Sequence, residues 1–148
     1  MYILIFLAVI FIDQASKYLA FLYLRNIGTF PLFQNILHLT YVENTGAAFG
    51  IFQNSQIFLS VISAVFIVVI FIYITYRRPK NRLFLYSLAL MAGGAAGNLI
   101  DRARLSYVID FIDFRAINFA VFNVADSAVV SGVILLLYYY IFNKEKVS

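Results

Sequence analysis

Two aspartates, Asp110 and Asp126, lie where the chain leaves one apolar region and enters another. Ionisable side chains are costly beside such regions, so they are functional candidates by default. Two carboxyl groups that share one proton can hydrolyse a peptide bond, because the ionised group activates water while the protonated group polarises the carbonyl. Taken singly, each aspartate has an equally good structural explanation. Asp126 could cap a helix, and Asp110 could pair with Arg102 or Arg104.

The composition excludes most other hydrolytic sites. The chain has no cysteine and one histidine, His38, which excludes thiolate nucleophiles, H-E-x-x-H zinc sites and most Ser-His sites. We identify no metal-ligand set and no glycine-rich phosphate loop, so neither a metal nor an organic cofactor is expected. The basic residues that give the net charge of +4 flank apolar runs, which favours membrane-topology signals over nucleic-acid binding.

The elements that must position the two aspartates are apolar helices. Of the 148 residues, 64% are hydrophobic, and the mean hydropathy is +0.90. A soluble domain is about half apolar, so the sequence predicts one integral membrane domain over 1–148. About 20 apolar residues cross a bilayer, and four segments are long enough. These segments are 2–24, 57–76, 83–100 and 124–142. The first has no basic residue before Lys17, so we expect a retained helix rather than a cleaved signal peptide.

The positive-inside rule orients these spans. The short loop 77–82 carries four cations and is expected in the cytoplasm. Four spans then place both termini in the cytoplasm, in agreement with Lys144 and Lys146. The segments 25–56 and 103–123 face outward, and the two aspartates lie near the outer face of the membrane.

The outer segments carry little helical pattern. Residues 36–44 alternate and include β-branched side chains, which is typical of a strand, and Asn44 opens a turn. The fold class expected is therefore mainly α: a four-transmembrane-helix bundle with a small extracytoplasmic β element. Segment 103–123 is expected to be a short outer connection or helix between the third and fourth spans.

Other polar residues share helix faces with one another. Asp13 and Lys17 have the i,i+4 spacing of an ion pair, which could support the bundle or shape a polar pocket. Asn98 and Arg102 have the same spacing and could orient a carbonyl or close the helix end. Gly93 and Gly97 have the G-x-x-x-G spacing that lets membrane helices approach closely.

Five motifs follow one another along the chain. They are Asp13-x-x-x-Lys17, Asn44-Thr45-Gly46-Ala47-Ala48-Phe49, Gly93-Gly94-Ala95-x-Gly97-Asn98-x-x-Asp101-Arg102, Val108-Ile109-Asp110-Phe111 and Phe122-Asn123-x-Ala125-Asp126. Together with the four spans, they resemble the lipoprotein signal peptidases, or signal peptidase II, a family of bacterial integral-membrane aspartic endopeptidases. The resemblance covers the whole chain, and we find no departure at the polar positions.

The resemblance implies an activity and a site. Asp110 and Asp126 match the catalytic aspartates of the family. The positions that match residues lining or shaping its active site are Asn44, Gly94, Asn98, Arg102, Asn123, Asp13 and Lys17. Members of this family remove the signal peptide from a prolipoprotein just before a cysteine that carries diacylglycerol. The resemblance therefore implies diacylglyceryl-modified prolipoproteins and membrane lipid as partners, and a bacterial cytoplasmic membrane location; we expect a monomer.

A different class of function uses the same residue types. Intramembrane Asp and Lys also mark proton- or ion-coupled transporters. A transport path should distribute polar groups through the bilayer, whereas here they concentrate toward one face and segment 57–76 carries no charge. The peptidase interpretation is therefore favoured.

Overall fold

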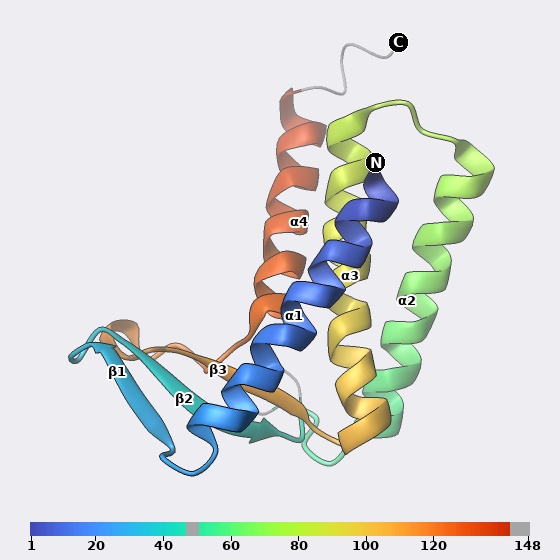
Figure 1. The fold of residues 1–148 in the computed structure, drawn as a ribbon. Helices are drawn as coiled ribbons and strands as arrows, with labels where there is room; N and C mark the ends of the chain where they lie inside the picture. Colours follow the sequence, from blue (N-terminus) through green and yellow to red (C-terminus); the bar gives the residue numbers. More distant parts are fainter. Residues whose placement is uncertain (47–50, 143–148) are drawn as a thin grey trace.

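A computed structural model describes residues 1–46 and 51–142 as four helices and a small sheet (Figure 1). The helices are α1 (Tyr2–Leu24), α2 (Gln56–Arg77), α3 (Arg82–Leu105) and α4 (Val124–Phe142). The strands are β1 (Thr29–Phe33), β2 (Leu37–Asn44) and β3 (Val108–Phe114), and β3 is followed by the short 3-10 helix η2 (Arg115–Ile117). All four helices are long and apolar enough to cross a membrane. The predicted fold class is therefore confirmed. The described residues do not include Ala47, Ala48 and Phe49 of the second motif, nor Lys144 and Lys146 near the C-terminus.

Helix α3 is the centre of the bundle, because it packs against α1, α2 and α4. Its small residues permit this close approach. A side chain at Gly93 would meet Val9 of α1, and one at Gly94 would overlap the backbone of α4 at Ala125. A side chain at Gly97 would overlap the carboxyl group of Asp13. The predicted role of Gly93 and Gly97 in close helix contact is confirmed.

The three strands form one antiparallel sheet in the order β1-β2-β3. The sheet lies at one end of the bundle, beside the last turns of α1 (Figure 1). Leu39 and Tyr41 project from β2 onto a cluster that includes Leu24 of α1 and Phe111 of β3. Burial of this apolar cluster fixes the sheet against the helices. It thereby fixes the position of β3, the strand that carries Asp110.

Two parts of the chain differ in detail from the sequence prediction. Helix α3 continues to Leu105 rather than ending at Ile100, so Asp101 and Arg102 are helical residues. The outer connection contains a seven-residue strand, β3, in addition to the short helix η2. Strand β3 forms because it pairs with β2, which lies far away along the sequence. A local pattern does not reveal such a distant partner.

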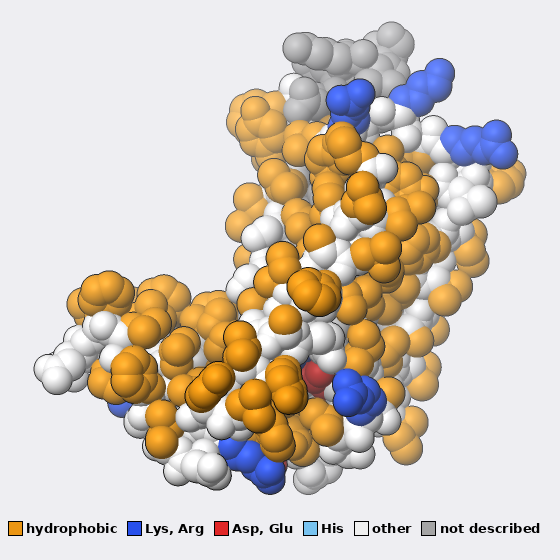
Figure 2. All heavy atoms as spheres, viewed as in Figure 1, with side chains coloured by type: hydrophobic (Ala, Val, Ile, Leu, Met, Phe, Trp, Pro, Cys, Tyr) orange, Lys and Arg blue, Asp and Glu red, His pale blue; other side chains and the backbone are white. Residues whose placement is uncertain are grey.

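The exterior of the molecule is apolar. Figure 2 shows hydrophobic side chains over the visible faces of the helices and the sheet, with Lys and Arg side chains gathered toward the two ends of the bundle. Soluble monomers rarely expose contiguous apolar patches of more than a few hundred Å². Helix α2 buries only Ile70 and Ile74 along its length, so most of its surface faces outward. This surface is what a helix bundle in lipid requires.

Candidate active site

A cavity of about 500 Å³ lies where α3, α4 and the sheet meet. Its polar lining comes from four elements: Asn44 of β2, Asn98 and Arg102 of α3, Asp110 of β3, and Asp126 of α4. The rest of the lining is mainly apolar. It includes residues 119–122 and the side chains of Val108, Val129 and Val130. The fold therefore brings both predicted aspartates into one mainly apolar cavity.

Asp126 is held at the start of α4. The Oδ1 atom of Asn123 accepts a hydrogen bond from the backbone N–H of Asp126 at 2.9 Å, and Oδ2 of Asp126 accepts one from the backbone N–H of Asn123 at 3.2 Å. This reciprocal arrangement is a capping box. The other carboxyl oxygen, Oδ1, accepts from Nδ2 of Asn98 at 2.8 Å. Asp126 therefore forms the predicted helix cap and also lines the cavity, and its catalytic role stays a prediction.

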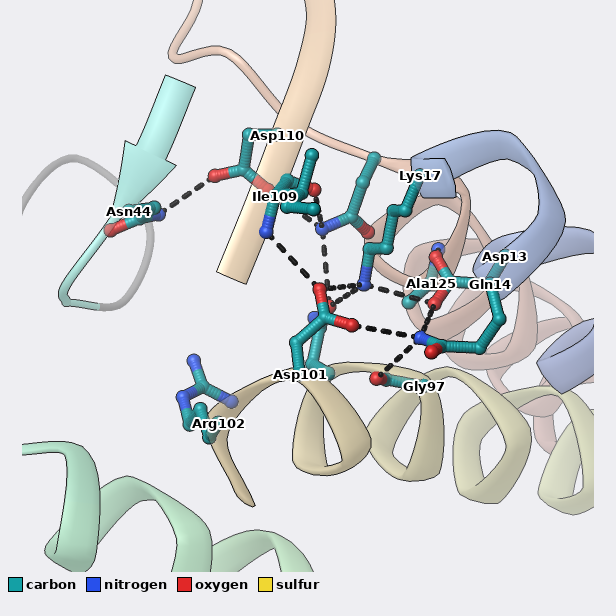
Figure 3. A network of polar contacts seen from close by, with 12 residues as sticks. Asp13, Gln14, Lys17, Asn44, Gly97, Asp101, Arg102, Ile109, Asp110 and Ala125 are labelled. Atoms are coloured by element: carbon teal, nitrogen blue, oxygen red, sulfur yellow. Dashed lines mark hydrogen bonds and ion pairs between the residues drawn. The ribbon is translucent and has the colours of Figure 1, made fainter. Parts of the chain in front are cut away.

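Asp110 is 2% exposed and accepts two amide hydrogen bonds. Nδ2 of Asn44 donates to its Oδ2 at 2.8 Å, and Nδ2 of Asn123 donates to its Oδ1 at 2.7 Å. Figure 3 shows Asn44 and Asp110 pointing toward each other from β2 and β3. Within the described residues, Asp110 forms no ion pair with Arg102 or Arg104. The loop ion pair considered for Asp110 is therefore not what holds it.

The environment of Asp110 favours its protonated form. Two effects raise the pKa of Asp110 to about 7: burial has the larger effect, and the negative charge of Asp126 has the next largest. The hydrogen bonds from Asn44 and Asn123 act in the opposite direction but do not cancel this effect. Asp126 lies in the first turn of α4, where the positive end of the helix dipole favours a carboxylate. The cavity therefore holds one carboxyl group, that of Asp110, whose surroundings favour its proton.

Two of the amide groups have their orientation fixed by backbone donors. The Oδ1 atom of Asn44 accepts from the N–H of Gly46 at 2.8 Å, and Oδ1 of Asn123 accepts from the N–H of Asp126. An amide that accepts through its oxygen must present its NH₂ group on the other side. In both residues that group faces Asp110. Asn44 thus both forms the predicted turn and supplies an amide to the site.

Arg102 lies at the edge of this site. One of its terminal nitrogens donates to the carbonyl oxygen of Gly46 at 3.2 Å, while its Nε is buried and has no hydrogen-bond partner among the described residues. Its charge interacts favourably with those of Asp126 and Asp110. Arg102 lines the cavity, so its side chain can meet a group that enters there.

Asp13 and Lys17 form the predicted i,i+4 ion pair, with Nζ of Lys17 at 2.9 Å from Oδ2 of Asp13. The pair is almost fully buried and does not line the cavity. Nζ also lies 3.0 Å from Oδ2 of Asp101 and donates to Oδ1 of Asn98 at 2.8 Å. Figure 3 shows Lys17 reaching from α1 into the space between Asp13 and Asp101. Asp101 in turn accepts from the backbone N–H of Ile109 at 3.1 Å, which ties α3 to β3.

The structure divides the predicted site residues into two groups. Asn44, Asn98 and Arg102 line the cavity together with the aspartates, whereas Gly94, Asn123, Asp13 and Lys17 lie behind its wall. Gly94 contributes by allowing α3 to approach α4. Among residues 1–46 and 51–142, no group of three or more His, Cys, Asp or Glu side chains could hold a metal ion.

Sequence reasoning missed two residues of the cavity lining, Ser127 and Ser131, and one residue of the buried cluster behind the cavity, Gln14. Gln14 donates to Asp101 at 2.8 Å and also lies within hydrogen-bond distance of Asp13 and of the Gly97 carbonyl oxygen. Its position next to Asp13 on an apolar helix was the available signal. Ser127 and Ser131 line the cavity one helical turn apart, and Ser131 lies five residues beyond Asp126. Only the placement of the cavity along α4 identifies them.

Comparison with known proteins identifies the relatives of this chain. A profile of the family described as "Signal peptidase (SPase) II" matches residues 5–142. A lipoprotein signal peptidase of Caldanaerobacter subterraneus subsp. tengcongensis is 53% identical over 142 residues, covering 96% of this chain and 97% of the relative. A lipoprotein signal peptidase of Clostridioides difficile is 42% identical over 146 residues, covering 99% and 98%.

The fold has a match among solved structures. A bacterial membrane enzyme determined by the in meso method at 2.3 Å resolution superposes with a TM-score of 0.90 at 30% identity. The superposition covers 99% of this chain and 91% of that one. The four helices and the sheet are therefore arranged as in an experimentally determined membrane enzyme.

Proposed function

This chain belongs to the signal peptidase II family, and from that premise we propose that Asp110 and Asp126 are its catalytic pair. The chain is a bacterial membrane aspartic peptidase that cleaves signal peptides from prolipoproteins. The single observation that carries the assignment is that the two aspartates, 16 positions apart in sequence numbering, line one cavity and share Asn123 as a hydrogen-bond partner.

The mechanism assigns different roles to the two carboxyl groups. Asp126, held as a carboxylate by Asn98 and the start of α4, takes a proton from water as the water oxygen attacks the scissile carbonyl. Protonated Asp110 donates a hydrogen bond to the carbonyl oxygen and stabilises the tetrahedral intermediate. The proton held by Asp126 then passes to the leaving amide nitrogen as the C–N bond breaks. Arg102, which lines the cavity, orients the substrate backbone.

The substrate class follows from the apolar walls of the cavity. We propose that the chain cleaves before a diacylglyceryl-modified cysteine, and that the lipid lies against the apolar lining at Val129 and Val130. A lipid-anchored residue stays at the membrane surface, so its peptide bond is presented at the depth of the aspartates. We also propose a single domain over 1–148 that acts as a monomer, because β2, α3, β3 and α4 of the one polypeptide together complete the lining of the cavity.

The orientation in the membrane is part of the same proposal. Arg78 and Lys80 lie in the connection between α2 and α3, and Arg77 and Arg82 are the helix residues on either side of it. This connection lies at the end of the bundle where α1 begins and α4 ends (Figure 1). Cytoplasmic loops carry an excess of Lys and Arg, so this end is placed in the cytoplasm. The sheet and the cavity are then at the outer face.

A transport function has less support. A proton or ion path requires polar groups along the length of the bundle. Among the buried polar side chains described, only Ser87 lies toward the α2–α3 connection, and α2 buries none. The remaining buried polar residues belong to the sheet end or to the Asp13–Lys17 cluster.

Cleavage of a defined lipopeptide tests the proposed function. The wild-type protein in detergent micelles should cut a diacylglyceryl-modified prolipopeptide immediately before the modified cysteine, and mass spectrometry of both products would locate the bond. The same peptide without its lipid is the control and should be cut much more slowly, because it is not held at the micelle surface. Equal cleavage of both peptides would exclude lipid recognition, and no cleavage of either would exclude the activity.

Activity should fall as the pH rises through about 7. The proposed acid, Asp110, must be protonated, and its pKa is raised to about 7, so the active form is present below that pH and is lost above it. The measurement is kcat/KM for the lipopeptide as a function of pH. An alkaline limb far from pH 7 would contradict the role of Asp110 as the acid.

The variant Asn44→Ala tests the direction in which the alkaline limb of the pH profile should move. The hydrogen bond from Asn44 lowers the pKa of Asp110, so its removal should move the alkaline limb to higher pH even if the overall rate falls. A general disturbance of the site would lower the rate without moving the limb in that direction. A shift to lower pH would count against the proposed roles.

A further inference from the structure

Lys17 has more partners than an ion pair requires. Its Nζ atom contacts Oδ2 of Asp13, Oδ2 of Asp101 and Oδ1 of Asn98, at 2.9, 3.0 and 2.8 Å. An ammonium group has three donors and no acceptor, so these three contacts use all of its capacity. Lys17 is 2% exposed, which leaves it no alternative partner in water.

The contact with Asn98 determines which way that amide faces. Because the ammonium group of Lys17 can only donate, the Asn98 atom beside it must be the oxygen. The same oxygen accepts from Nδ2 of Asn123 at 3.1 Å, so two donors hold it in place. The NH₂ group of Asn98 is then directed to the other side, where it donates to Oδ1 of Asp126 at 2.8 Å.

Asp126, the last residue in this series of contacts, is catalytic in the proposed function, and the following inference rests on that proposal. We propose that Lys17 is a positioning residue that acts through Asn98: its ammonium group locks the Asn98 amide so that Asp126 always meets a donor and is held as the carboxylate that activates water. A reversed Asn98 amide would direct an oxygen at Asp126. Two facing acceptors would repel each other, and Asp126 would lose its position.

The alternative is that Lys17 only ties the helices together. That role is real, because Asp13 also accepts from the backbone N–H of Ala125 at 2.8 Å and the cluster therefore joins α1, α3 and α4. Gln14 offers a matched comparison. It bonds to the same cluster, at Asp13, Asp101 and the Gly97 carbonyl, but it does not contact Asn98. A purely structural role predicts the same consequences for the loss of either residue.

The variant Lys17→Met removes the ammonium group but leaves Asp13 and Asp101 as two buried, unpaired carboxylates, which is strongly destabilising. The comparison is therefore made in an Asp101→Asn background. With both changes the cluster keeps one carboxylate and the net charge of the wild-type cluster, and Asp101→Asn alone is the reference. Thermal unfolding in the same detergent verifies that each variant is folded before its kinetics are compared.

Relative to Asp101→Asn, the double variant should lose about 10-fold in kcat on the diacylated prolipopeptide, with KM little changed, because Lys17 does not touch the cavity. Lys17→Gln, which keeps a donor, should recover part of the loss. Gln14→Leu should lower the unfolding temperature and leave kcat unchanged. If Gln14→Leu lowers kcat as much as Lys17→Met does, the positioning role is wrong.

A double-mutant cycle isolates the contact with Asn98. When Asn98→Leu is added to the Asp101→Asn background the amide is gone, so Lys17→Met should then change kcat by less than about 3-fold. If the fold-losses in kcat caused by Lys17→Met and by Asn98→Leu instead multiply, Lys17 does not act through Asn98. Asp126→Asn separates this result from the proposed function. If Asp126→Asn still cleaves, the assignment of the catalytic pair is wrong. If Asp126→Asn is inactive and the two fold-losses in kcat multiply, only the role of Lys17 is wrong.

Discussion

Replacing either Asp110 or Asp126 with asparagine is expected to lower kcat by on the order of 10³-fold or more, since each substitution removes either the acid or the base of the proposed mechanism. Asparagine has nearly the shape of aspartate but can neither accept a proton from water nor supply the acid. The measurement is single-turnover cleavage of the diacylated prolipopeptide. The binding of the peptide, measured separately, should persist, because the cavity keeps its shape.

The two variants also carry a cost in stability. Both oxygens of each carboxyl group accept hydrogen bonds, so one of them must become an NH₂ group that faces another donor. Loss of one such bond costs about 1–3 kcal/mol. Asp113→Asn is the matched control, since Asp113 is buried on the same strand but bonds to Thr40 and Arg115 away from the cavity. Asp113→Asn should retain cleavage, and substantial cleavage by either catalytic-site variant would overturn the assignment.

Substitution of Asn123 should have the second largest effect, about 100-fold in kcat, because this fully buried residue serves both aspartates. Its NH₂ group donates to Asp110 and to Asn98, and its oxygen caps α4 at Asp126. Asn123→Ala removes all of these contacts. Loss of the cap adds about 1 kcal/mol of destabilisation.

Asn123→Ser separates the two roles of this residue. Serine is an effective N-cap but has no amide to offer Asp110. Asn123→Ser should therefore unfold at a higher temperature than Asn123→Ala in detergent and remain equally poor in cleavage. Recovery of activity together with stability would mean that the residue matters only as a cap.

The helical part of the fold could be predicted because apolar length is a local property. The second span, for example, contains no charge between Ile57 and Tyr76, and α2 covers this stretch. The end of α3 was less predictable. Asp101 and Arg102 look like a polar boundary, but their side chains are paired within the structure, so the helix continues past them to Leu105.

Strand β3 could not be predicted from the local sequence, because it depends on pairing with a distant strand. Asp110 and Asp113 interrupt its apolar pattern. Both side chains are stabilised by hydrogen bonds from other elements, such as those from Asn44 and Thr40 of β2. The site was predictable for a different reason. Residue types near the span ends marked Asp110 and Asp126, whereas the direction in which Asn98 presents its amide depends on Lys17 of another helix.

The order of elements along the chain has a consequence for biosynthesis. The cavity draws on β2, α3, β3 and α4, so Asp126 is supplied by the last helix that the ribosome makes. Until α4 is inserted beside α3, Asp110 has no carboxylate partner and Asn98 has no acceptor on that side. With Asp110 and Asp126 as the proposed catalytic pair, we therefore expect the nascent protein to stay inert toward neighbouring membrane polypeptides until the bundle is complete.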